Sequence, residues 1–182
     1  MNMKIKMIFL AAAIVIAGCA KQQSATDASN LKPVTSAFGH TLGDKVSGEI
    51  ENPLMIRDTP PFTMASIDQI SDGRICQIIA SGTVEEFDLH DTKNRLISVL
   101  TEKYGSRGKM GIEKYTVEMG DEGYYFGTTN RVAHLWIKDY QTNAFFCLEY
   151  YDKELKTTFF KEQQAKDKLE DDNKKAALSK GL

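Results

Sequence analysis

Three cysteines and three histidines are the side chains of this sequence best suited to nucleophilic or metal chemistry. The histidines, His40, His90 and His134, share no spacing typical of a metal site, so we predict no bound metal. Asp88, His90 and Asp91 form a polar group that could bind a cation, but a helix cap with its turn explains these residues better.

Local catalytic motifs are absent from the sequence. It contains no GxSxG nucleophile elbow, Walker loop, GxGxxG turn or HExxH helix, and its cysteines form no CxxC pair. We therefore predict no catalytic residues and no cofactor. An enzyme would need an active site assembled from distant parts of the chain, and that alternative stays open.

The N-terminal segment has the features of a secretory signal. Lys4 and Lys6 precede an apolar run of about ten to twelve residues, which is short of the roughly twenty that span a membrane. The run ends in Ile16-Ala17-Gly18-Cys19, which resembles the lipobox of bacterial lipoproteins. The resemblance implies cleavage before Cys19, a diacylglyceryl group on its thiol and a fatty acid such as palmitate on the new amine. An ordinary secretory signal with a chance cysteine is the alternative.

The same resemblance implies a location. Two or three acyl chains anchor a protein stably in a bilayer, since each buried methylene contributes about 0.8 kcal/mol. Ala20 is not the aspartate that tends to retain lipoproteins in the inner membrane of enterobacteria. We therefore expect a lipid-anchored protein of the cell envelope, on the outer membrane and facing the periplasm.

Four segments are predicted along the chain. They are a signal peptide (1–18), the lipidated cysteine with a flexible tether (19–33), a globular domain (34–160) and a charged C-terminal helix or tail (161–182). The tether is rich in Gln, Ser, Ala and Thr, and a coil of its length has an end-to-end distance on the order of 20 Å.

The composition favours a folded domain and argues against nucleic acid as a partner. Hydrophobic residues make up 42% of the sequence and aromatic residues 9%, which is ordinary for a globular protein. The 23 lysines and arginines are outnumbered by 25 acidic residues, and no basic stripe is present.

The pattern of apolar residues predicts an α+β domain, an antiparallel meander with one or two helices packed on it. A hairpin is expected from Phe62 to Ala80, turning at residues 71–73. Asp91 and Thr92 could cap a helix of about thirteen residues that ends at Gly105. The meander strands are expected at residues 112–119, 124–128, 131–140 and 144–151.

The chain changes character after Asp152, where acids and lysines alternate. We predict a helix whose first turns dock through Leu155 and Phe159. Beyond Leu169 the pattern fits either a frayed, solvated tail or a helix that binds a partner.

Cys76 and Cys147 remain after lipidation of Cys19, and each lies in an apolar, strand-like run. In an oxidising periplasm they could form a disulfide, and closing a loop of about seventy residues would contribute roughly 4 kcal/mol. Two buried, unpaired thiols are the alternative.

The segment Phe38-Gly39-His40-Thr41-Leu42-Gly43 predicts a tight turn that docks Phe38 and Leu42 on the core. Together with Lys103-Tyr104-Gly105 it resembles small uncharacterised envelope proteins of Gram-negative bacteria that share a Phe-Gly-x-x-Leu-Gly start. This resemblance supports a fold and carries no activity.

Aromatic residues of the predicted meander are the candidates for a binding surface, namely Trp136, Tyr124 and Tyr140. Alternation places His134, Trp136 and Lys138 on the less apolar face of their strand. Trp136 is therefore either an exposed interface anchor or a residue packed beneath the C-terminal helix against Phe159 or Phe160.

These observations favour a binding function. We expect a periplasm-facing adaptor or inhibitor module that docks an envelope protein or glycan. An envelope enzyme with a nonlocal active site and a structural lipoprotein that supports envelope integrity are the alternatives.

Overall fold

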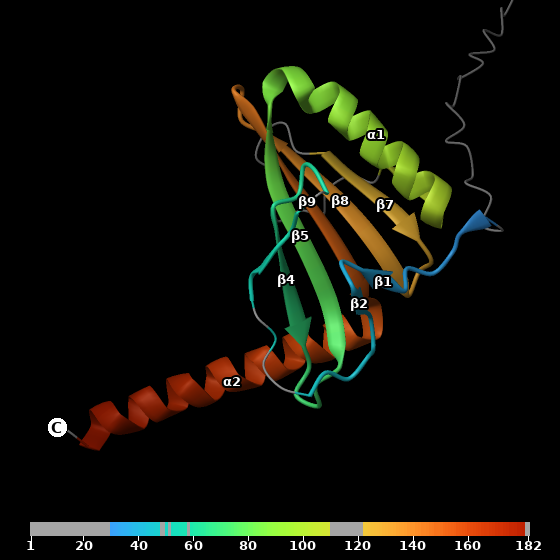
Figure 1. Ribbon diagram of the computed structural model, residues 1–182. Coiled ribbons are helices and arrows are strands. Elements are labelled where there is room, and N and C mark those ends of the chain that lie inside the picture. Colours follow the sequence, from blue (N-terminus) through green and yellow to red (C-terminus); the bar gives the residue numbers. More distant parts are fainter. Residues whose placement is uncertain (1–29, 48–49, 51, 58, 110–121, 181–182) are drawn as a thin grey trace, which may run out of the picture.

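The computed structural model describes residues 30–47, 50, 52–57, 59–109 and 122–180 of the chain. They form a seven-stranded antiparallel sheet with two helices packed on it, which confirms the predicted α+β class (Figure 1). Cys19 and the predicted strand 112–119 lie outside the described residues.

The sheet has the strand order β3-β4-β5-β9-β8-β7-β6. Helix α1 (Glu86–Tyr104) carries the chain from β5 in the centre to β6 at one edge, and the meander β6 to β9 returns to pair with β5. The strands of the sheet are β3 (Leu54–Met55), β4 (Met64–Gln69), β5 (Ile75–Glu85), β6 (Ser106–Lys109), β7 (Glu122–Gly127), β8 (Arg131–Asp139) and β9 (Asn143–Asp152).

The inner face of the sheet carries the core. In β8, Ala133, Leu135 and Ile137 are buried on this face, while His134 and Trp136 alternate with them and are less buried. Helix α1 and the segment before β4 cover the inner face, as Figure 1 shows. The alternation read from the sequence therefore assigned the two faces of β8 correctly.

Helix α1 begins at Glu86, six residues before the start that a cap at Asp91 predicts. Glu86 and Asp88 lie in its first turn, where negative charge is favourable, and Glu85 at the cap position makes no side-chain capping bond. Asp91 and Thr92 lie inside the helix, so the prediction that they cap it is wrong.

The Phe38–Gly43 segment forms the tight, docked turn that the sequence predicted. It links β1 (Ser36–Ala37) to β2 (His40–Thr41). The Phe38 ring meets the Phe62 ring edge-on at 6.3 Å, and Leu42 is fully buried.

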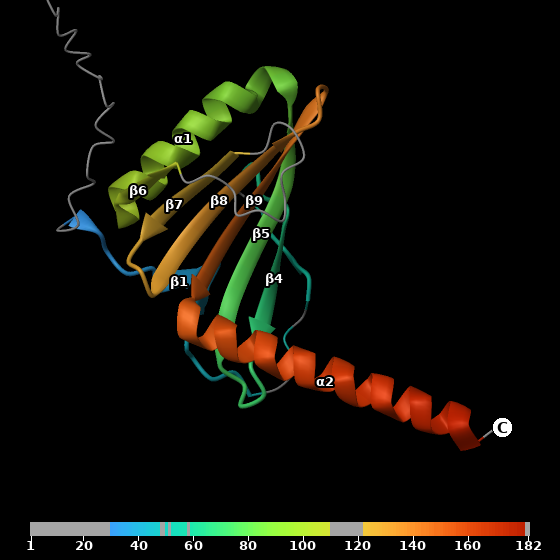
Figure 2. The same cartoon turned by 180° about the vertical axis from the view of Figure 1, so that it is seen from behind.

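Helix α2 (Lys153–Lys180) follows β9 directly and crosses the outer face at one end of the sheet (Figure 2). The Asp152 carboxylate caps it by accepting from the backbone N–H groups of Glu154 (3.1 Å) and Leu155 (3.2 Å). Farther along, the Glu162 carboxylate accepts hydrogen bonds from the backbone N–H and hydroxyl of Ser71, in the turn between β4 and β5.

The rest of α2 projects beyond the sheet as an arm. Every side chain from residue 164 to residue 178 is exposed, and the segment is about 22 Å long at 1.5 Å per residue. The helix is continuous through the predicted domain boundary at residue 160, so this boundary does not coincide with a break in structure. Neither described helix combines the length and the apolar character that crossing a bilayer requires.

The outer edge of β4 is only partly paired by the two-residue strand β3. Next to β3, the Asn52 side chain forms hydrogen bonds with both backbone groups of Ile67, its carbonyl oxygen and its N–H. Its Nδ2 donates to the Ile67 carbonyl oxygen at 3.2 Å, and its Oδ1 accepts from the Ile67 N–H at 3.3 Å. One carboxamide thus fills the two positions where a neighbouring strand would bond.

Candidate functional site

A band of apolar side chains crosses the outer face of the sheet beside α2. The strand register aligns Met55 with Met64, Met64 with Ser81, Ser81 with Cys147 and Cys147 with Trp136. With its neighbours on β5, β9 and α2 the band comprises Met55, Met64, Ile79, Trp136, Phe145, Cys147 and Phe160, and we call these seven residues the outer patch.

Several members of the outer patch are well exposed. Met55 is 72% exposed, Met64 42% and Phe160 51%. Apolar surface of this kind on a folded domain is typical of an interaction site. The outer patch is therefore the candidate functional site.

Trp136 lies in the outer patch and is partly buried. Its ring meets the Phe145 ring edge-on, with centroids 5.8 Å apart. Phe159 and Phe160, the partners considered from the sequence, pack instead on each other at 5.9 Å. Trp136 thus rests on a strand neighbour, with part of its surface open.

A series of charged and aromatic contacts holds α2 against β9, beside the outer patch. Lys156 forms an ion pair with Glu149, and its ammonium lies 4.3 Å from the centroid of the Tyr151 ring. The same Glu149 lies 3.7 Å from His134 Nδ1, and the His134 ring stacks on Tyr125 at 4.2 Å. Burial alone would raise the pKa of Glu149, but the hydrogen bond from His134 and the charge of Lys156 outweigh it, so this pKa lies below its usual range.

The pKa of the Asp68 carboxyl is shifted in the opposite direction, above its usual range. Burial raises the pKa of its carboxyl, the charge of Glu149 raises it further, and Lys156 opposes both. Gln77 Nε2 donates to Asp68 Oδ2 at 3.2 Å, while the buried Gln77 Oε1 has no hydrogen-bond partner among the described residues. The ionised Asp68 is therefore an unfavourable group in the folded domain at neutral pH.

Asp68→Asn should raise the melting temperature at pH 7, because the amide keeps the acceptor for Gln77 and removes the buried charge. A carboxyl with a raised folded pKa costs stability above that pKa and recovers it as the pH falls toward the unfolded value of about 3.9. The increase in melting temperature that Asp68→Asn causes should therefore become smaller as the pH falls. Thermal melts followed by circular dichroism from pH 7 to pH 4 measure this change.

Asp72→Asn is the matched control for that experiment. The backbone N–H of Arg74 and the Arg74 guanidinium lower the pKa of this exposed carboxyl, so its removal should not stabilise the domain at pH 7. Equal gains from both substitutions would show that net charge, and not burial of Asp68, sets the effect.

The predicted disulfide between Cys76 and Cys147 is wrong. Both thiols are free. Cys147 lies opposite Ser81, five positions along β5 from Cys76, which is about 16 Å at 3.3 Å per residue and far beyond the roughly 7 Å that a disulfide spans. Burial raises the pKa of Cys76 to about 12 and that of Cys147 to about 11, so both thiols are protonated and poorly nucleophilic at neutral pH.

The three aromatic candidates named from the sequence do not form one surface. Tyr124 lies on the inner face opposite Leu135, and its hydroxyl donates to Glu122 Oε2 at 2.6 Å. Tyr140 lies after β8, 51% exposed, with the Lys138 ammonium 5.3 Å from its ring centroid. Of the three, Trp136 alone belongs to the outer patch.

The three histidines lie on different elements, His40 in β2, His90 in α1 and His134 in β8, whereas Asp88 and Asp91 lie near His90 on α1. His90 lies on α1 with its Nε2 2.8 Å from Asn94 Nδ2, one turn along the helix. Across the described part of the chain, no three His, Cys, Asp or Glu side chains lie close enough together to hold a metal ion. Asp88 and Asp91 are exposed on the same helix as His90.

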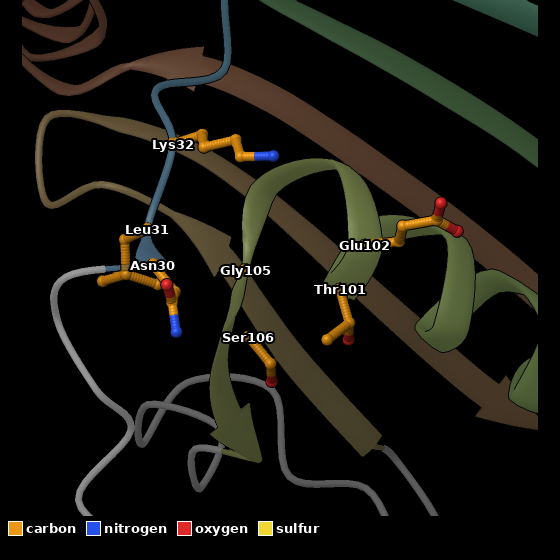
Figure 3. A pocket seen from close by; sticks show the side chains of 7 residues that line it. All are labelled: Asn30, Leu31, Lys32, Thr101, Glu102, Gly105 and Ser106. Atoms are coloured by element: carbon orange, nitrogen blue, oxygen red, sulfur yellow. The ribbon is translucent and has the colours of Figure 1, made fainter.

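A pocket of about 420 Å³ lies where the chain enters the domain (Figure 3). Lys32 N donates to the Tyr104 carbonyl oxygen at 3.0 Å, which ties the entering segment to the end of α1. The lining combines the entering segment with this end of α1 and the start of β6: Asn30, Leu31, Lys32, Thr101, Glu102, Gly105 and Ser106. The lining contains no histidine or cysteine, and its shape follows from the docking of the entering segment.

Comparison with known proteins gave no relative: no family model matches the chain, and no curated protein or solved structure matches it significantly.

Proposed function

We propose that this chain is a lipid-anchored protein of the bacterial envelope that binds another envelope protein through the outer patch, as an adaptor or inhibitor on the periplasmic side of the outer membrane. The observation that carries the proposal is the exposed apolar band across the outer face of the sheet. The lipobox-like Ile16–Cys19 segment supports the anchor.

The chemistry of the outer patch favours a protein partner over a glycan. Met55 and Met64 present flexible thioethers, which suit the irregular apolar surface of a protein. Trp136 and Phe145 meet edge-on, with an interplanar angle of 73°, so they do not form one flat platform for a sugar ring. A partly open tryptophan surrounded by apolar neighbours is the usual composition of an interface hot spot.

The site residues favour binding over catalysis. Burial keeps the thiols of Cys76 and Cys147 protonated. His134 is engaged by Glu149 and stacked on Tyr125. Among the described residues of this face, no nucleophile lies beside an available base, the arrangement that an enzymatic function would need.

The proposal is tested by photo-crosslinking in intact cells, with a photoreactive amino acid at position 64 in the full-length protein. A position-64 probe should give one dominant protein adduct, and the same probe at the exposed α1 position Val99 should not. Trp136→Ala in the position-64 probe should lower the adduct yield at least tenfold, the scale of a lost interface hot spot. Palmitate labelling of the wild type, absent from Cys19→Ser, tests the anchor in the same cells.

Three results of this crosslinking experiment would contradict the proposal. An unchanged yield with Trp136→Ala, in a protein that melts normally, would reject the outer patch as the binding surface. Adducts to polysaccharide would replace the protein partner with a glycan. Envelope leakage on deletion, without any adduct at position 64, would favour the structural lipoprotein instead.

A further inference from the structure

Two exposed methionines lie opposite each other in the outer patch, on the paired strands β3 and β4. The strand register makes Met55 and Met64 direct partners, and they are 72% and 42% exposed. Directly opposed side chains of an antiparallel pair lie on the same face, with their Cβ atoms about 5 Å apart. The two thioethers therefore form one accessible, sulfur-bearing surface at the β3–β4 end of the outer patch.

The thiols of the described domain are less open to oxidation than these thioethers. Cys76 is fully buried and Cys147 is partly buried. Burial raises the pKa of both thiols, so neither supplies the thiolate that oxidants attack at neutral pH. A thioether has no proton to lose, so its reactivity depends on exposure and not on a pKa. Met55 and Met64 are thus the sulfur groups that an oxidant in solution reaches most readily among the described residues.

Oxidation changes the chemistry of this surface. A two-electron oxidant of the hypohalous acid class, such as hypochlorous acid, converts a thioether into a sulfoxide. In the net reaction an S–O bond forms and the O–Cl bond breaks, the sulfur loses two electrons to chlorine, and chloride and a proton leave. The sulfoxide oxygen is a polar acceptor in place of an apolar group. Burying this oxygen against an apolar partner without a hydrogen bond disfavours the complex.

We propose that Met55 and Met64 form a redox switch in the outer patch: a hypohalous acid oxidises both thioethers to sulfoxides and releases the envelope partner, and reduction of the sulfoxides restores binding. In the reverse step a dithiol supplies two electrons and two protons, becomes a disulfide, and the sulfoxide oxygen leaves as water. This inference rests on the proposed function, because it concerns the regulation of the same surface.

The test measures photo-crosslinking from position 160 of the full-length protein, in membranes isolated from its own cells. Phe160 is the member of the outer patch on α2 and is 51% exposed, so this probe leaves both methionines in place. Hypochlorous acid should add one oxygen to Met55 and one to Met64, measured by peptide mass spectrometry. The adduct yield should then fall about tenfold, the scale of a lost interface hot spot. Methionine sulfoxide reductase with a dithiol should restore the yield.

Two double substitutions in the position-160 probe are the matched controls. Met55→Leu with Met64→Leu keeps the apolar volume and removes both thioethers, so the adduct yield should be the same before and after oxidation. Met110 and Met119 remain in this variant, which tests whether the effect belongs to the outer patch. Met55→Gln with Met64→Gln introduces polar side chains and should lower the yield without any oxidant. Both variants should melt like the wild type, because both positions are exposed.

Three results would overturn the switch. These are an unchanged yield after both methionines have gained oxygen, an equal loss of yield in the leucine variant, and a loss that the reductase does not reverse. Untreated membranes separate this inference from the proposed function. If neither position 64 nor position 160 gives a protein adduct there, the proposed function fails and the switch fails with it. If the adduct forms and persists after oxidation, the switch alone fails.

Discussion

Phe146→Ala is expected to lower the free energy of unfolding by about 3–5 kcal/mol, the range for loss of a fully buried phenylalanine. Phe146 is among the largest side chains with no exposed surface, and it lies on the inner face opposite Gly82 and Ile137. Alanine would leave a cavity between the sheet and the layer that covers it. Because small proteins are stable by about 5–15 kcal/mol, this single change removes a large share of the total.

Phe145→Ala is the matched control, since it removes the same ring one residue earlier on the outer face. Phe145 is partly buried, so its loss should cost clearly less than that of Phe146. Urea unfolding followed by circular dichroism measures both variants. Equal losses would mean that the outer face is packed as fully as the inner face.

Gly82→Ala should destabilise the domain by about 1–3 kcal/mol or more, the usual cost of overpacking a core. A Cβ at this position would lie 1.9 Å from the Pro61 carbonyl oxygen and 3.0 Å from the Phe62 Cα. Both obstacles are backbone atoms, so no side-chain rotation relieves the contact. The segment before β4 crosses β5 at the one point where β5 has no side chain.

Ser81→Ala is the control for this effect, because Ser81 precedes Gly82 in β5 and points to the outer face. It should change the unfolding midpoint little. A Gly82→Ala variant as stable as Ser81→Ala would show that the Pro61–Phe62 segment moves away from the sheet at little cost.

Sequence patterns predicted the elements that have a clear period. Ala133, Leu135 and Ile137 alternate with polar residues, which assigned the faces of β8. The hairpin of β4 and β5 and the strands β7 to β9 followed from apolar runs between turn residues. The start of α1 was missed because residues 86–90, Glu-Phe-Asp-Leu-His, alternate polar and apolar side chains with the period of a strand and not of a helix.

The candidate site was harder to predict, because it depends on register between strands. Tyr124, Tyr125 and Phe126 are consecutive aromatics, so alternation gives no face until the pairing with β8 is known. Methionine is an apolar residue type, so the sequence alone suggests that Met55 and Met64 are buried in the core, whereas both are exposed. The alternation of Met64 with the buried Ala65 was the available signal that Met64 faces outward.

The bonds between Asn52 and Ile67 have a consequence for the lipid anchoring proposed above. Tethering raises the local concentration of identical chains, and an open strand edge would then act as a template for sheet growth from one molecule to the next. At Ile67, the donor and the acceptor that a foreign strand would need are already occupied by Asn52. The Asn52 side chain thus opposes strand-to-strand aggregation at the β4 edge, and it leaves the apolar surface of the outer face free for binding.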